Sequence, residues 1–463
     1  MAVKAGYLPL YIKLYDDDDP HMRDPMVAHM ERMVCEIRKR GVELVVADVC
    51  RTRPEFEKAL ELFEREQVSA VITQHLAYSP SLCSLDALLK LRVPIIVFDT
   101  TPDLHIAGVQ DEKDCINDNH GIHGVQDMCA MLRRHGRSYT IAAGHAENSS
   151  VLDEVVSACR AAEAAKAFRN ARVGTVGGSF EGMGDFLISE EDLRSRIGAE
   201  TVSLGTGEGK AYEDAVTEEE IDREIACDKE TFAFEVKSEE PYRKSIRSGL
   251  AIRKWIAEKE LTALTVNFLK TDDAGLATMP FEELSKAMAR NIGYAGEGDK
   301  LTAAMAGGLM SVYGDRVTFT EMFCPDWTED LILLSHMGEA NLKAAAWKPV
   351  LTDIDFPYNA YGRTAAAYFA LKAGNAVLVN LSPTEGKMSM ILTKVTLIDR
   401  GHEKNVYRYA MQGWMKPCVP VKDFLKAYSE LGGTHHSVLV YDVPVEELAA
   451  FGRMMDFDVN IIE

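Results

Sequence analysis

Short apolar, β-branched runs alternate with stretches of helical periodicity through the first third of the chain. The runs are typical of buried strands and lie at 43–48, 68–74, 93–99 and 138–143. Between them, apolar residues recur every three or four positions in segments such as 22–40 and 53–66, which predicts amphipathic helices. Strands that alternate with helices in this way favour a parallel sheet covered on both faces, so we expect an α/β domain here.

The same alternation restarts after a long Ala-rich helix predicted near 151–168, which indicates a second α/β domain. Its strand candidates are 172–176, 201–204 and 263–268. From about Val317 the strands follow one another with fewer helices between them, which favours an antiparallel sheet or barrel. These later strands are predicted at 317–323, 330–334, 376–380, 387–399, 406–412 and 437–443.

The predicted fold class is therefore α/β, with two Rossmann-like parallel-sheet domains followed by a C-terminal, mainly antiparallel, barrel-like β domain. We place the N-terminal domain at 1–165, the central domain at 166–315 and the C-terminal domain at 316–463. A chain of 463 residues is too long for one ordinary core, so a division into two or three domains is expected.

Composition narrows the possible partners. The formal charge of −21 makes nucleic acid an improbable partner, because its phosphates are neutralised by Lys and Arg. No run reaches the roughly 20 apolar residues that span a bilayer, so no membrane association is predicted. The nine cysteines are odd in number and scattered, which favours a reducing compartment such as the cytoplasm. The four aspartates at 16–19 are predicted to form a solvated loop before a helix.

The densest polar cluster lies between Tyr294 and Asn341. Glu297 stands between two glycines, and Glu321 and His336 each end an apolar, strand-like run. Farther along, a Gly-Gly-Thr turn leads to His435 and His436. Two carboxylates and two imidazoles suit Mn²⁺, Co²⁺, Mg²⁺ or Zn²⁺ better than a metal that needs thiolates. Taken singly, each of these residues is also compatible with a cap, a turn or a surface position.

The order of four short motifs adds a more specific indication. They are GYAGEGDKLTA at 293–303, TFTE at 318–321, SHMGE at 335–339 and GGTHHS at 432–437. In this order they resemble the L-arabinose isomerase family, within the L-arabinose and L-fucose isomerase superfamily, and the chain resembles a divergent member. The resemblance implies an aldose–ketose isomerase, an intramolecular oxidoreductase that converts L-arabinose to L-ribulose or acts on a related sugar such as D-galactose.

The resemblance also implies roles for particular residues. Glu297, Glu321, His336 and His436 would bind the metal, and the two glutamates would be the acid/base pair for proton transfer through a cis-enediol. The implied cofactor is a divalent ion, with Mn²⁺ as the first candidate and Co²⁺ or Mg²⁺ as alternatives. Members of the family form trimers or hexamers in which a neighbouring subunit completes the active site, so a homo-oligomer with its site at a subunit interface is expected.

Substrate contacts are implied by weaker matches. NDNHGIHG at 117–124 is similar to a family segment that carries a histidine near its end. The chain departs from the family at Ile12, where the family has Gln, at His120, which replaces Gln, and at Phe323, which replaces Tyr. These departures predict a changed sugar-binding wall. The expected substrate contacts are His435, His123, His120, Met183, Phe268, Lys13 and Phe323.

Two other readings stay open. An isomerase of the L-fucose or D-arabinose type would use a Glu, Asp and His set instead of two glutamates and paired histidines. A non-catalytic sugar-binding protein would also carry two α/β domains in tandem. A nucleotide-binding enzyme is disfavoured, because GTGEGK at 205–210 lacks the phosphate-loop spacing. A serine hydrolase is disfavoured as well, because the chain has no G-x-S-x-G.

Overall fold

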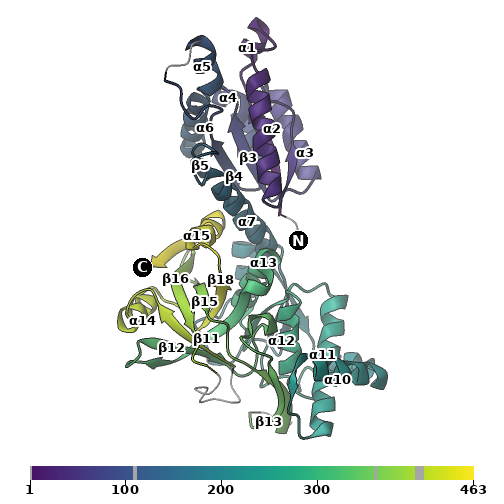
Figure 1. Cartoon of the computed structure of the whole chain (residues 1–463). Coiled ribbons are helices and arrows are strands. Elements are labelled where there is room, and N and C mark those ends of the chain that lie inside the picture. Colours follow the sequence, from purple (N-terminus) through teal and green to yellow (C-terminus); the bar gives the residue numbers. More distant parts are fainter. Residues whose placement is uncertain (1–2, 108–111, 359–361, 402–410) are drawn as a thin grey trace. The chain divides into compact units, whose positions relative to one another are not determined.

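The computed structural model describes residues 3–107, 112–358, 362–401 and 411–463, and the chain divides into two compact units (Figure 1). Unit 1 is Met1–Glu163 and unit 2 is Ala164–Glu463. The α/β class with parallel-sheet domains and a C-terminal barrel is confirmed. The three predicted domain boundaries stay predictions. None of the described helices is long and apolar enough to cross a membrane.

Unit 1 contains a five-stranded, all-parallel sheet in the order β2-β1-β3-β4-β5. The strands are β1 Val3–Leu10, β2 Val42–Val46, β3 Ala70–His75, β4 Ile95–Asp99 and β5 Thr140–Ala143. Four of them match the predicted strands. The interior strand β1 was not predicted, because its sequence VKAGYLPL has a single β-branched residue and is interrupted by Gly6 and Pro9.

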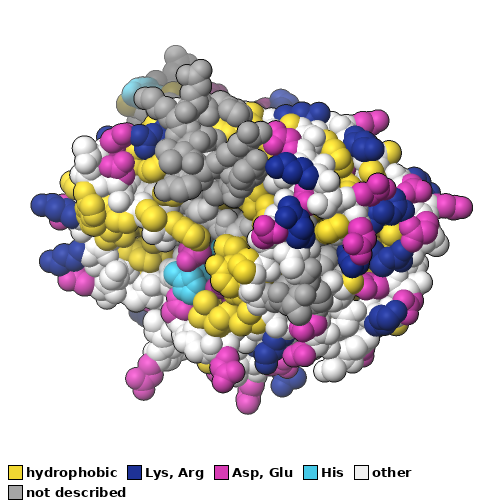
Figure 2. Space-filling model, turned by 90° about the horizontal axis from the view of Figure 1, so that it is seen from below, with side chains coloured by type: hydrophobic (Ala, Val, Ile, Leu, Met, Phe, Trp, Pro, Cys, Tyr) yellow, Lys and Arg dark blue, Asp and Glu magenta, His cyan; other side chains and the backbone are white. Residues whose placement is uncertain are grey.

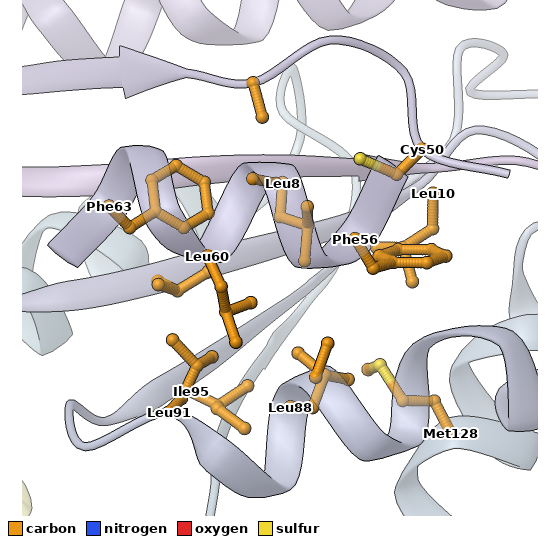
Figure 3. Close-up of a cluster of buried hydrophobic side chains, with 14 of the residues drawn as sticks. Leu8, Leu10, Cys50, Phe56, Leu60, Phe63, Leu88, Leu91, Ile95 and Met128 are labelled. Carbon is orange, nitrogen blue, oxygen red and sulfur yellow. The ribbon is translucent and has the colours of Figure 1, made fainter. Parts of the chain in front are cut away.

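One face of this sheet is covered by three helices whose apolar side chains form a single core. Figure 3 shows Phe56 and Phe63 of α3, Leu88 of α4 and Met128 of α6 in this cluster with Leu8 of β1. A capping box between Thr52 and Glu55 fixes the start of α3. The helices that begin in unit 1 are α1 Lys13–Asp18, α2 Asp24–Lys39, α3 Arg53–Arg65, α4 Ser81–Lys90, α5 Glu112–Asn119, α6 Ile122–Arg134 and α7 Val151–Arg169.

The prediction of a solvated loop at 16–19 is wrong. Asp16 to Asp18 belong to α1, and the Asp16 carboxylate pairs with Arg23 at 2.9 Å and with Arg51 at 2.5 Å. These two ion pairs explain why a run of acidic residues is compatible with a helix at this position.

Unit 2 begins with a second parallel sheet, in the order β10-β9-β6-β7. Its strands are β6 Arg172–Val176, β7 Glu200–Leu204, β9 Ala263–Val266 and β10 Gly293–Gly296. A Cβ on Gly293 would meet the backbone nitrogen of Gly307 at 2.2 Å, so this glycine allows α13 to lie directly against β10. The helices of this part are α8 Glu190–Asp192, α9 Glu208–Asp214, α10 Glu218–Thr231, α11 Glu239–Glu258, α12 Phe281–Ala289 and α13 Lys300–Tyr313.

Six strands then close into a barrel in the order β15-β18-β11-β12-β17-β16, with β16 pairing back onto β15. They are β11 Val317–Asp326, β12 Leu331–His336, β15 Gly374–Pro383, β16 Met388–Ile398, β17 Met411–Pro417 and β18 His436–Tyr441. β19 Asp458–Ile462 adds to β16 in parallel. Of the strand predicted at 406–412, residues 406–410 lie outside the described residues, and the last two begin β17.

The remaining elements of unit 2 are two helices and a small sheet. The helices are α14 Val421–Glu430 and α15 Val445–Met454, and the sheet has the order β14-β13-β8. Its strands are β8 Ala233–Phe234, β13 Val350–Phe356 and β14 Gly362–Tyr368.

Strand β11 continues past the position at which the sequence predicts its end. Glu321 lies opposite His436 on β18 and Ser335 on β12, and the register with β12 then shifts between Met322 and Cys324. A bulge at this point lets the strand run on to Asp326 and leaves Phe323 47% exposed. The predicted end at 323 is therefore wrong.

Candidate active site

The turn between β10 and α13 presents Glu297. Its backbone has a φ of 62°, in the left-handed region, and the following Gly298 has a φ of 86°. A Cβ on Gly298 would meet the carbonyl oxygen of Gly178 at 2.3 Å, so this residue must be glycine for the loop after β6 to pack here. Because the Glu297 amide also donates to the Val266 carbonyl at 2.9 Å, the turn is fixed on both sides.

Side chains from this turn and from the barrel strands converge. Glu297, His435 and His436 have ligand atoms within 4.8 Å of one another, and Glu321, His336 and His436 form a second such group. The structure therefore brings together all four predicted metal ligands, with His436 common to both groups. Glu297 Oε2 lies 3.5 Å from Nε2 of both His435 and His436. The face of the molecule drawn in Figure 2 shows a histidine side chain bordered by hydrophobic and acidic side chains.

Each of the two barrel histidines is oriented by a buried carboxylate. Nδ1 of His336 lies 2.7 Å from Glu339 Oε2, and Nδ1 of His436 lies 3.1 Å from Asp299 Oδ2. Aromatic rings hold the imidazoles from the sides: Phe186 stacks on His436 with an interplanar angle of 6° and centroids 5.0 Å apart. With Nδ1 bonded in this way, Nε2 is the nitrogen left to bind a ligand.

The donor set fits a divalent cation. His436 is fully buried, yet its Nε2 has no hydrogen-bond partner, which is costly unless something binds there. The groups around it are carboxylate oxygens and imidazole nitrogens, which suit hard to borderline divalent ions. A third acidic group of ligand spacing, Glu224, Asp228 and Glu282, is different because the Lys286 ammonium pairs with all three carboxylates.

The electrostatics of the two glutamates differ. Burial alone would raise the pKa of Glu297, but the neighbouring imidazoles of His435 and His436, each 3.5 Å from its carboxylate, outweigh it and lower the pKa to about 2. Burial raises the pKa of Glu321 above its ordinary value, against the opposing effect of the histidines. Burial would lower the pKa of His436, yet the nearby carboxylates of Asp299 and Glu297 raise it to about 9. Glu297 is thus held ionised, and Glu321 is the more easily protonated of the pair.

Four of the predicted substrate contacts belong to unit 2, and their role in binding a substrate stays a prediction. His435 is anchored by Asp185, whose Oδ2 is 2.6 Å from Nδ1 and accepts the His435 backbone N–H at 3.0 Å. Phe268 follows β9 and its ring lies 5.5 Å from that of Phe180, whose amide donates to the Glu297 carbonyl. Met183 is half-buried in the loop that also carries Asp185. Phe323, on the bulge, is two residues beyond Glu321.

Sequence reasoning missed Asp185, Phe186 and the support that Asp299 and Glu339 give to the histidines. Asp299 and Glu339 stand inside the quoted motifs, so their position next to ligand residues was an available signal. Asp185 gave no such signal, because it lies 250 residues from the histidine that it holds.

The other three predicted contacts belong to unit 1. His120 Nε2 lies 3.0 Å from the Tyr15 hydroxyl, and the rings of His120 and His123 are 5.9 Å apart. His123 is exposed, and Lys13 is an exposed residue of α1 that pairs with Asp17. Unit 1 therefore gathers its own polar cluster after β1 and at the start of α6. A substrate role for these residues stays a prediction.

Family models match nearly the whole chain. The N-terminal, central and C-terminal domains of L-arabinose isomerase match residues 13–170, 191–314 and 316–458. The protein is thus an aldose–ketose isomerase, an intramolecular oxidoreductase. Within that class, the chain belongs to the L-arabinose isomerase family, so the resemblance recognised in the four motifs is confirmed.

Individual relatives are distant but aligned over most of their length. An L-arabinose isomerase of Shouchella clausii is 23% identical over 95% of this chain and 91% of the relative. One of Geobacillus stearothermophilus is 26% identical over 94% and 90%. Among solved structures, a periplasmic solute-binding protein from Actinobacillus succinogenes with bound D-allose has 12% identity and a TM-score of 0.19, covering 67% of this chain and 91% of that one. Such a low score carries no argument for the sugar-binding alternative.

Proposed function

We propose that this protein is a divalent-metal-dependent isomerase of a neutral aldose, with L-arabinose to L-ribulose as the first candidate reaction and D-galactose as a related substrate. The observation that supports the metal most directly is the convergence of two carboxylates and a second imidazole on His436, whose buried Nε2 makes no hydrogen bond. An uncharged polyol fits the changed sugar-binding wall, whose members are mainly imidazole, aromatic and thioether side chains.

The residues that would hold the metal are Glu297, Glu321, His336 and His436. A bound cation supplies Lewis-acid stabilisation of the negative charge that develops on the sugar oxygens. Mn²⁺ is the first candidate and Co²⁺ or Mg²⁺ the alternatives, because the donors are oxygen and imidazole nitrogen without thiolate.

The two glutamates would then move the protons. One of the two glutamates, as the base, takes the proton from C2, while the other, as the acid, donates to O1 and so gives the cis-enediol. The acid then accepts the O2 proton, and the base returns its proton to C1, which completes the ketose and restores both groups.

The test is an assay of metal-stripped protein with L-arabinose, D-galactose, L-fucose and D-arabinose, with and without Mn²⁺. We expect metal-dependent ketose formation that Glu297→Gln abolishes, and the best aldose would identify the sugar that the altered wall recognises. No ketose from any of the four sugars, with Mn²⁺ bound and the assembly intact, would contradict the proposal.

We further propose that a neighbouring subunit completes the site, in a trimer or hexamer. Exposed apolar side chains next to site residues support an apolar contact surface in unit 2. They are Leu187, Leu269, Phe323, Trp327 and Tyr358, which are 43% to 66% exposed. Unit 1 of the neighbour would bring Lys13, His120 and His123 to the sugar.

This arrangement can be tested by mixing two inactive variants, Glu297→Gln and His123→Ala, under conditions in which subunits exchange. If the site is shared between subunits, a random equal mixture regains about a quarter of the activity, because one site in four has both intact halves. If each chain supplied both halves itself, the mixture would stay inactive.

The cytoplasm is the proposed location. All nine cysteines lie among the described residues and all are free, which suits a reducing compartment. Fractionation of cells that express the tagged protein would test this location, and recovery of the protein from an oxidising compartment would contradict it.

A further inference from the structure

Glu339 connects a ligand histidine to the parallel sheet of unit 2. Its Oε2 lies 2.7 Å from His336 Nδ1, and its Oε1 accepts a hydrogen bond from the Tyr294 hydroxyl at 2.8 Å. The Glu339 side chain is 2% exposed and Tyr294 is 1% exposed, so water does not compete for either bond. The two oxygens of this carboxylate are thus taken by one residue of β10 and one residue of the barrel strand β12.

This arrangement leaves the His336 ring little freedom. A Cβ on Gly296 would lie 2.8 Å from His336 Cε1 and 2.9 Å from Nε2, so the imidazole lies directly against β10. If Glu339 turned away from Tyr294, His336 would lose the acceptor that keeps a proton on Nδ1 and a lone pair on Nε2. The position of the Glu339 carboxylate therefore determines which nitrogen is offered to a cation.

One short segment, residues 294–299, contributes three contacts to the cluster. It contains Glu297 itself and Tyr294, which donates to Glu339. It also contains Asp299, whose Oδ1 caps α13 and whose Oδ2 bonds His436. On this geometry, we propose that Tyr294 is a positioning residue that acts through Glu339 to hold His336 in its metal-binding orientation. The inference rests on the proposed metal centre and assigns a role to two residues that do not themselves touch the cation or the sugar.

The chain contains a matched control for this pair. Tyr313, also buried, donates its hydroxyl to Oε1 of Glu447 on α15 at the same distance of 2.8 Å. Tyr313→Phe removes the same kind of hydrogen bond at the same depth as Tyr294→Phe. Comparison of the two variants separates a role at the metal centre from the general cost of a lost buried hydroxyl.

The experiment measures the Mn²⁺ dissociation constant of the full-length protein by electron paramagnetic resonance of free Mn²⁺, together with the melting temperature of each variant without metal. We expect Tyr294→Phe to weaken Mn²⁺ binding by about 10-fold or more, as for other residues that orient a ligand histidine, while Tyr313→Phe leaves binding unchanged. Glu339→Gln should weaken binding at least as much, because one of the two carboxylate oxygens becomes an NH2 group, which cannot accept the hydrogen bond of Tyr294 or His336. Saturating Mn²⁺ should restore most of the Tyr294→Phe turnover.

The outcomes separate this role from the metal centre itself. Equal Mn²⁺ affinity in Tyr294→Phe and the unaltered chain would overturn the positioning role alone. An equal loss of affinity in both phenylalanine variants would also overturn it, because the effect would then be general destabilisation. A lack of Mn²⁺ binding by the unaltered chain would overturn the proposed metal centre, and the positioning role with it.

Discussion

Metal binding at this site is expected to displace a proton from His436. In the structure, its Nε2 lies 3.5 Å from the Glu297 carboxylate and its Nδ1 lies 3.1 Å from that of Asp299. Although burial opposes the charge, these two acidic partners raise the pKa of His436 to about 9. At neutral pH the imidazole is therefore protonated, and a cation can bind Nε2 only after that proton has left.

The size of the effect follows from the pKa. At pH 7 the imidazole is about two pH units below its pKa of about 9, so Mn²⁺ should bind about 100-fold more weakly than at a pH above 9, which is about 2.7 kcal/mol. Between pH 6 and 8, each unit of pH should change the dissociation constant about tenfold. Because the folded pKa exceeds the unfolded value of about 6.5, the same proton stabilises the metal-free fold fully below pH 6.5, and this stabilisation is lost as the pH rises through about 9.

Isothermal titration of metal-free protein with Mn²⁺ at pH 7, in buffers of different ionisation enthalpy, counts the protons released. We expect about one proton per ion from His436, and a dissociation constant that falls steadily as the pH is raised from 6 to 8. Release of no proton, or an affinity that does not depend on pH over this range, would refute the assignment of His436 as a protonated group that becomes a ligand. Asp299→Asn should reduce the proton release, because it removes a partner that favours the charged imidazole.

Three further predictions test the surroundings of the site. Asp185→Asn removes a charge-assisted hydrogen bond to His435, and the free energy of such a bond corresponds to a fall in kcat/KM of about 10- to 100-fold. The Mn²⁺ affinity, measured in a parallel titration, should not change. Gly296→Ala places a methyl group 2.8 Å from a ring carbon of the β12 histidine, so we expect a loss of about 1–3 kcal/mol in thermal unfolding and weaker Mn²⁺ binding; a variant with unaltered affinity would contradict that contact. Lys286→Met leaves the buried carboxylates of Asp228 and Glu282 without their cation and should cost about 3–5 kcal/mol of unfolding free energy. Lys254→Met, at a more exposed ion pair, should cost less than about 1 kcal/mol.

Most of the fold could be predicted from hydrophobic patterning, and the strands that were missed or misplaced have physical explanations. Strands bounded by turn residues were located because they alternate with amphipathic helices. Val3–Leu10 was missed because Val3 is its only β-branched residue and Gly6 and Pro9 interrupt the run, so it lacks the composition that marked the other strands. The end of β11 was misplaced because the bulge at Phe323 puts exposed residues into a strand that continues beyond them.

The candidate site could be predicted only where its residues sit in local motifs. Each of the four predicted metal ligands stands within a short recognisable segment: Glu297 lies at a turn, His336 and His436 lie at strand ends, and Glu321 lies within β11. The structure brings the four together. Asp185 lies on a loop without any pattern, and only the packing of that loop against Gly298 carries it to His435. A contact between two loops that are distant in the sequence produces no periodic pattern from which it could be predicted.

The site lies where the parallel sheet of unit 2 meets the antiparallel barrel, and its side chains are positioned differently by the two. Residues two apart on β11 point to the same side of the strand, so Phe319, which contacts the ring of His336 at a centroid distance of 4.8 Å, is followed by Glu321 on that side. Barrel pairing then puts Glu321 opposite His436, which fixes these two groups by strand register. Glu297 comes instead from a left-handed turn after a parallel strand, and the bonds of Asp299 and Glu339 are what hold that turn and the barrel histidines in one arrangement. A substitution at either carboxylate should therefore disturb the relative position of the two sheets at the site more than the stability of either sheet.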